Sequence, residues 1–109
     1  MLNQAINLID SEDIARSERV LLELQNISKP GSFHQKRTEL FLSIARYKKL
    51  SDENTIENIR KSFKGLESLQ SQFSLIEKRG FDRDRKRLVE LLKLETLEAL
   101  ETLMKSSQE

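Results

Sequence analysis

The sequence predicts an all-α fold, an antiparallel up-and-down bundle of three to four helices, with coiled-coil-like pairing as one form of it. Ala, Glu, Leu, Lys and Arg supply 54 of the 109 residues, the composition of long helices or coiled coils. Three glycines and one proline are too few for the turns of a many-stranded β fold. Apolar residues also recur at helical spacing along most of the chain. A chain of this length has one core, so we expect residues 1–109 to form a single domain.

The first half of the chain predicts a short helix over 2–9 and long helices over about 12–28 and 33–50. Polar and acidic residues at 10–13 favour a helix start, because their side chains accept hydrogen bonds from the free N–H groups of a first turn. Pro30 and Gly31 end the second helix, since proline cannot continue a helix and glycine permits the turn. Ser32, followed three residues later by Gln35, fits a capping box and begins the next helix.

The second half predicts two further long helices, over about 52–79 and 82–105. The polar residues at 51–53 are typical of a helix cap. Neither glycine nor proline interrupts the chain there, so one continuous bent helix is the competing interpretation. Gly80 predicts a left-handed cap that ends the helix over 52–79. Asp82 or Asp84 then caps the last helix.

The chain offers little catalytic chemistry. It has one histidine, His34, no cysteine and no glycine-rich phosphate loop. A single histidine in the first turn of a helix is much more often an exposed or hydrogen-bonded residue than a catalytic one, and a transition-metal site needs a cluster of ligands. We therefore predict a protein that is not an enzyme, with no catalytic residues, no metal ligands and no cofactors.

The ends and the apolar runs of the chain predict where it resides. The N-terminus lacks the basic region and long apolar core of a signal peptide, and no apolar run approaches the roughly 18 residues of a membrane span. The absence of cysteine is compatible with a reducing compartment. We expect a cytoplasmic protein that has no membrane partner.

Charge is segregated along the chain although the net charge is only +1. Residues 1–28 carry two basic and five acidic side chains, residues 29–87 carry fifteen and eight, and residues 88–109 carry two and five. Acidic ends that flank a basic middle indicate either helices that pair through complementary surfaces or a basic face for an anionic partner.

The segment 78–87 is the strongest functional candidate. Its proposed partner-binding or anion-binding residues are Lys78, Arg79, Phe81, Arg83, Arg85, Lys86 and Arg87. Six cations at a corner between two predicted helices suit phosphates, and Phe81 suits stacking on a base. Cations at a helix start also oppose the helix dipole, which an acidic protein surface would compensate. The plainer alternative is a solvated surface on which Asp82 and Asp84 pair with neighbouring arginines.

A second basic group surrounds Tyr47 and consists of Arg46, Lys48 and Lys49. It supports nucleic-acid binding only if folding places it beside the segment 78–87, because one strand must contact both groups.

Leucines fill the last predicted helix and step through it mainly in threes. On a helix of about 3.6 residues per turn such a step drifts around the axis, so the apolar arc is wide. A wide arc is buried against two neighbours, which are two helices of the same chain or one helix and a second subunit. The residues proposed for a seam between subunits are Leu94, Leu97, Leu100, Leu103 and Met104.

These observations predict a non-enzymatic protein–protein interaction module, an adaptor or regulatory subunit. It binds a protein partner that has an acidic patch, and it self-associates as a homo-oligomer, such as a homodimer, through apolar helix faces. The alternative is a small regulator that binds nucleic acid through the segment 78–87.

Overall fold

The computed structural model describes residues 2–50 and 52–105, and these residues form six α-helices and one 3-10 turn, with no strand. The helices are α1 (Leu2–Asp10), α2 (Ile14–Ile27), α3 (Phe33–Leu50), α4 (Glu53–Glu67), α5 (Leu75–Leu91) and α6 (Leu97–Lys105), and the 3-10 turn η1 is Gln70–Gln72. The predicted all-α helical bundle is confirmed.

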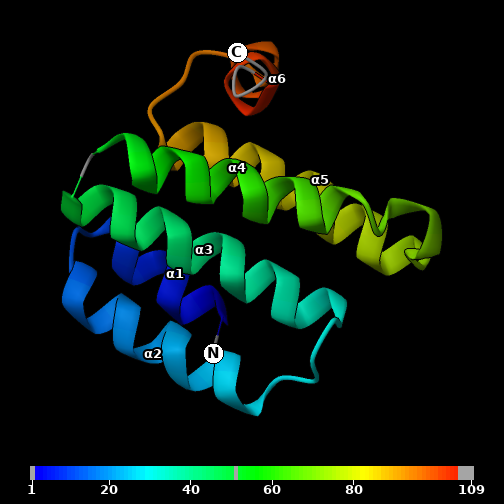
Figure 1. Cartoon of the computed structure of the whole chain (residues 1–109), viewed down its shortest axis with the longest axis horizontal. Coiled ribbons are helices and arrows are strands. Elements are labelled where there is room, and N and C mark those ends of the chain that lie inside the picture. The colour runs from blue at the N-terminus through cyan, green and yellow to red at the C-terminus, as the bar shows by residue number, and fades with distance from the viewer. Residues whose placement is uncertain (1, 51, 106–109) are drawn as a thin grey trace.

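Five of the helices form two layers, and the sixth, α6, packs across them (Figure 1). α2, α3 and α4 lie side by side in one layer, and α1 and α5 lie behind them. Helices that follow one another from α1 to α4 contact each other in pairs and run in alternating directions, as short connections require. α1, α3 and α5 run in the same direction. α6 crosses one end of the bundle, where it contacts α4 and α5.

α3 is the central helix, because its side chains are buried on several sides. Its fully buried apolar residues are Leu40, Phe41, Ile44 and Ala45. Such a wide buried arc is expected of a helix with neighbours on more than one face, and α3 contacts α1, α2 and α4.

The predicted boundaries of the first half are observed to within two residues. The backbone turns at Gly31, whose φ of 77° suits glycine. Ser32 Oγ accepts a hydrogen bond from Gln35 N at 3.1 Å, and Gln35 Oε1 accepts one from Gly31 N at 2.7 Å. α3 and α4 are separate helices, and Asp52 caps α4 by accepting a hydrogen bond from Thr55 N at 2.9 Å. Ser51, at the predicted boundary, lies outside the described residues.

The prediction of one helix over 52–79 that ends at Gly80 is wrong. α4 ends at Glu67, and α5 begins after Ser74 and continues through Gly80. Ser74 Oγ accepts a hydrogen bond from Glu77 N at 3.2 Å, and Glu77 Oε1 accepts one from Ser74 N at 3.0 Å, so a capping box sets this start. A Cβ at Gly80 would lie 3.6 Å from Phe33 Cζ, an ordinary contact, so this glycine lies inside α5 where the helix packs against Phe33 of α3. Asp82 and Asp84 are therefore helix-interior residues and not caps.

The prediction of a continuous last helix over 82–105 is also wrong. α5 ends at Leu91 and α6 begins at Leu97. Lys93 has a φ of 57°, Leu94 N donates to Val89 O at 2.9 Å, and Lys93 N donates to Glu90 O at 3.2 Å. These two bonds form a Schellman motif with lysine in the place that glycine usually takes. Thr96 Oγ1 then accepts a hydrogen bond from Ala99 N at 3.0 Å at the start of α6.

Candidate functional site

The basic segment 78–87 lies in the middle of α5 and not at a corner between helices. Its exposed cations are Lys78, Arg79, Arg83 and Lys86, while Arg85 and Arg87 are partly buried. Phe81 and Asp84 point the other way and are buried. Because the segment is helical, its cations point to more than one side of α5 and do not form a single cluster.

Phe81 cannot stack on a base as predicted, because it belongs to the core. Its side chain is 1% exposed. Its ring centroid lies 5.8 Å from that of Phe63 and 5.7 Å from that of Phe73. The role of an aromatic platform for nucleic acid is excluded for this residue.

A buried ion pair joins α3 to α5, and neither of its residues belongs to the site predicted from the sequence. Arg37 Nε donates to Asp84 Oδ2 at 2.6 Å, and Arg37 Nη2 donates to Asp84 Oδ1 at 2.8 Å. The guanidinium also lies 5.5 Å from the centroid of the Phe33 ring. The sequence does hold a signal for this pair, because Arg37 and Asp84 both occupy apolar-face positions of their helices, one turn after Phe33 and one turn before Leu88.

Burial sets the titration of Asp84. Its removal from water raises the pKa of the Asp84 carboxyl above the ordinary value, because desolvation penalises the charged form. The hydrogen bonds and charge of Arg37, and the charge of Arg83, act in the opposite direction and lower that pKa.

A groove of ≈ 640 Å³ runs between α1 and α5, within the size range of ligand sites. α1 contributes Asn3, Ile6 and Asn7 to it. α5 contributes Gly80, Arg83, Asp84, Lys86, Arg87 and Glu90, and α3 contributes Arg37. Four cationic side chains against two anionic ones make the groove electropositive.

Two of the groove cations are available to a ligand. Arg83 and Lys86 are exposed and form no hydrogen bond or ion pair with any residue that the structure describes. Arg87 is engaged more loosely, since its Nη1 lies 3.3 Å from Glu90 Oε1 and its Nη2 lies 3.5 Å from Asn7 Oδ1. An anion that enters the groove therefore meets cations that do not have to leave a strong partner.

Arg85 faces away from the groove. Its Nη2 donates to Glu101 Oε2 of α6 at 2.6 Å, and its Nη1 lies 3.7 Å from Asp82 Oδ1. Its guanidinium lies 5.9 Å from the centroid of the Phe81 ring. Arg85 thus ties α5 to α6, and the structure separates it from the other predicted site residues.

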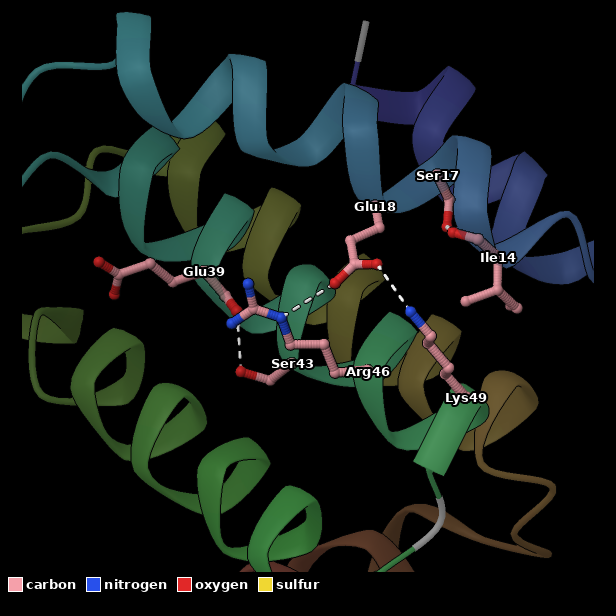
Figure 2. Close-up of polar contacts among 7 residues, drawn as sticks. All are labelled: Ile14, Ser17, Glu18, Glu39, Ser43, Arg46 and Lys49. Carbon is pink, nitrogen blue, oxygen red and sulfur yellow. Dashed lines mark hydrogen bonds and ion pairs between the residues drawn. The ribbon is translucent and has the colours of Figure 1, made fainter.

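The second basic group does not join the groove. Figure 2 shows Glu18 of α2 between Arg46 and Lys49 of α3. Glu18 Oε2 lies 3.2 Å from Arg46 Nε, and Glu18 Oε1 lies 3.8 Å from Lys49 Nζ. Arg46 follows Arg37 by nine residues, which is about half a turn around α3. The two arginines therefore serve opposite sides of that helix.

The predicted subunit seam is largely covered within one chain. Leu100 and Met104 are buried, Leu94 and Leu103 are partly buried, and Leu97 is 37% exposed. Leu94, Leu103 and Met104 line an apolar pocket of ≈ 170 Å³ together with Tyr47 of α3 and Ile56 and Ile59 of α4. In this conformation Leu100 and Met104 are core residues.

Neither a metal centre nor a membrane span is found in the part of the chain that the structure describes. In residues 2–50 and 52–105 no three His, Cys, Asp or Glu side chains cluster in a way that could hold a metal ion, and His34 is exposed. No helix among these residues is both long and apolar enough to cross a membrane.

No protein-family model, curated protein or solved structure matches this chain. The functional argument therefore rests on the geometry of the groove.

Proposed function

We propose that this protein is a non-enzymatic protein–protein interaction module whose groove between α1 and α5 binds an acidic segment of a partner. The observation that carries the proposal is the exposed pair Arg83 and Lys86, which forms no hydrogen bond or ion pair with the described residues and lies beside the partly engaged Arg87. Cations that are already desolvated on one side attract carboxylates more strongly than fully solvated ones do.

The groove suits a peptide better than a point anion. It is long enough to involve α5 from Gly80 to Glu90, and α1 adds the side-chain amides of Asn3 and Asn7. Side-chain amides both donate and accept hydrogen bonds, so they can pair with a peptide backbone. Ile6, between them on α1, is 3% exposed and belongs to the core, so the amides are the main contacts that α1 offers. Charge sets the orientation and the association rate of such a complex, and the amide contacts hold it.

A nucleic-acid regulator remains the competing proposal, with less to support it. Exposed Arg83 and Lys86 suit phosphates as well as carboxylates. Single-stranded binding also uses aromatic stacking, and Phe81, the aromatic residue within the segment, is buried. The basic group around Arg46 is engaged by Glu18 on another side of α3.

The test compares three fluorescent probes on the full chain by anisotropy: a glutamate-rich peptide, its glutamine counterpart and an oligo-dT strand. We expect the glutamate peptide to bind with an affinity that falls as salt rises, and the glutamine peptide to bind at least about tenfold more weakly. Tighter binding of oligo-dT than of the glutamate peptide would instead favour the nucleic-acid alternative.

Two charge reversals on the same helix locate the binding site. Arg83→Glu changes a cation of the groove, whereas Lys78→Glu makes the same charge change about 140° away around α5. We expect Arg83→Glu to weaken the glutamate peptide about tenfold and Lys78→Glu by less than about twofold. Equal losses in both variants would show that net charge, and not the groove, attracts the peptide.

A further inference from the structure

The chain breaks between α5 and α6 although the leucine spacing on either side of the break favours a continuous helix. Leu91, Leu94 and Leu97 continue the leucine spacing across the break, and no glycine or proline occurs between 81 and 105. Lys93 nevertheless adopts a φ of 57°, a left-handed conformation that costs energy for any residue with a Cβ. The segment 92–96 is thus a short, strained hinge in a stretch whose residues favour a helix.

The connection between α1 and α2 provides an internal comparison. Glu12 has a φ of 67°, Asp13 N donates to Leu8 O at 2.8 Å, and Glu12 N donates to Ile9 O at 3.0 Å, so the same Schellman motif occurs. There the four residues from Asp10 to Asp13 are all polar and interrupt the apolar pattern. Sequence and backbone agree on a turn at Glu12, and they disagree at Lys93.

α6 is attached to the bundle by a small set of contacts that any second copy also offers. Leu100 and Met104 are buried where α6 crosses α4 and α5. Arg85 Nη2 bonds Glu101 Oε2 at 2.6 Å, and Arg60 Nε donates to Leu103 O at 2.8 Å. Because α6 fits this site in its own chain, an α6 that arrives from another copy fits it equally well.

We propose that two copies of this chain exchange α6. The segment 92–96 becomes helical, α5 and α6 merge into one helix, and each α6 occupies the site on α4 and α5 of the other copy. Exchange relieves the left-handed Lys93, and strained short hinges favour such swapping. It reconciles the predicted seam, Leu94 to Met104, with the burial of Leu100 and Met104 in a single chain. This inference is independent of the groove between α1 and α5.

The first test measures the monomer–dimer equilibrium of hinge variants by light scattering. Lys93→Gly removes the left-handed penalty and favours the turn, whereas Lys93→Ala favours the continuous helix. We expect the alanine variant to dimerise at least about tenfold more tightly than the glycine variant. Glu12→Gly, which relieves the matching motif at the other turn, should leave the dimer constant unchanged. Equal constants for the two Lys93 variants would overturn the exchange.

The second test identifies whose α6 occupies each site. Arg85→Glu and Glu101→Arg each place like charges at the contact between α5 and α6. The two variants, one of them isotopically heavy, are mixed in denaturant, refolded together and weighed by native mass spectrometry. In an exchanged heterodimer one site regains Arg85 with Glu101 and the other holds the reversed pair, so the heterodimer should exceed roughly half, the statistical share, by a wide margin.

A heterodimer share of roughly half would indicate a dimer without exchange, and monomers at every concentration would exclude self-association through α6. Either result overturns the proposal. The double variant Arg85→Glu/Glu101→Arg, which restores an attractive pair within each homodimer, controls for folding through its helical circular dichroism. If either single variant fails to fold, the Lys93 series decides the question.

Discussion

Two arginines of α3 hold carboxylates from other helices, and their surroundings differ sharply. Arg37 binds Asp84 of α5 through two hydrogen bonds of 2.6 and 2.8 Å, and the Asp84 side chain is 5% exposed. Arg46 lies 3.2 Å from Glu18 of α2, and its own side chain is 46% exposed (Figure 2). The two ion pairs therefore contribute differently to stability, because water screens the exposed pair and hardly screens the buried one.

The buried pair also has a place in the groove that the exposed pair lacks. Arg37 and Asp84 both line the groove between α1 and α5. Gly80 and Phe33, one turn earlier on the same two helices, are also neighbours, so α3 and α5 pack together on both sides of this turn. Arg46, with Glu18 and Lys49, joins α3 to α2 at the surface. Loss of the first pair should therefore disturb fold and groove together, and loss of the second should disturb neither.

Asp84→Ala should have the largest effect on stability. It leaves the guanidinium of Arg37, which is 21% exposed, without its carboxylate. Removal of one partner of a buried ion pair costs several kcal/mol, and the partial exposure of Arg37 moderates this to about 2–4 kcal/mol. Urea unfolding at neutral pH measures the free energy.

Asp82→Ala is the matched control for this change, because Asp82 is an exposed aspartate on the same helix. It should alter the unfolding free energy by less than about 0.5 kcal/mol. The double variant Arg37→Met/Asp84→Leu should recover most of the stability, since an apolar pair replaces the charges. A loss for Asp84→Ala as small as that for Asp82→Ala would show that the buried pair is no stronger than a surface pair.

The pH dependence of stability separates desolvation from pairing at Asp84. Because burial raises the pKa of Asp84, the native state holds this proton more tightly than the unfolded state does. The proton-linked part of the Asp84 contribution to stability is then largest below its unfolded pKa and is lost as pH rises through its native pKa. The cost of leaving Arg37 without a partner in Asp84→Ala is separate from this part and persists at neutral pH. We expect the advantage of the wild type over Asp84→Asn to shrink over this interval.

Urea unfolding of wild type, Asp84→Asn and Asp82→Asn from about pH 3 to about pH 7 covers the ordinary carboxylate range. The other carboxylates titrate alike in wild type and variant, so their contribution cancels in the difference between the two unfolding free energies at each pH. An advantage that instead grows with pH would mean that the charge of Arg37 outweighs desolvation and lowers the pKa of Asp84.

Sequence reasoning succeeded where local signals were strong and agreed with one another. The turn at Pro30 and Gly31, the caps at Ser32 and Asp52, and the helices over 2–50 follow from hydrogen-bonding residues next to apolar periodicity. The all-α fold follows from composition. These features depend on neighbouring residues alone, so they could be read without the tertiary structure.

The boundaries in the second half of the chain and the grouping of the site residues were not predictable in the same way. Gly80 has the sequence context of a helix cap, but the Ser74 and Glu77 capping box, which is itself a local signal, starts α5 six residues earlier, and Gly80 lies inside that helix. The end of α5 at Lys93 has only a weak local signal, the threonine at 96 that caps α6, because the leucines from Leu91 to Leu97 keep a helical spacing. The cations of 78–87 were predicted as one site, but the start of α5 at Ser74 rotates Arg85 toward α6 and Phe81 into the core.

Gly80→Ala tests whether α5 is continuous beneath the buried pair. In a helix interior alanine is better than glycine by about 0.5–1 kcal/mol, and its Cβ would meet Phe33 Cζ at 3.6 Å, an ordinary contact. We therefore expect a modest gain in the midpoint of urea unfolding. Gly65→Ala in α4, where the nearest atom is Lys36 Nζ at 3.9 Å, should gain as much. Gly31→Ala should lose stability, because its φ is 77°. A loss at Gly80 like that at Gly31 would restore the cap predicted from the sequence.

Glu18→Ala removes the carboxylate of the exposed cluster on α3 and should have a much smaller effect than Asp84→Ala. Glu18 is 21% exposed, but both its partners are largely solvated, so water screens the attraction and the two long cations lose little when released. We expect a loss below about 1 kcal/mol, measured by urea unfolding, that shrinks further at high salt. Binding of the glutamate-rich peptide should be unchanged, since Glu18 does not line the groove. A loss as large as that of Asp84→Ala, and insensitive to salt, would mean that the Glu18 cluster acts as a second structural tie across α3 rather than as a solvated surface pair.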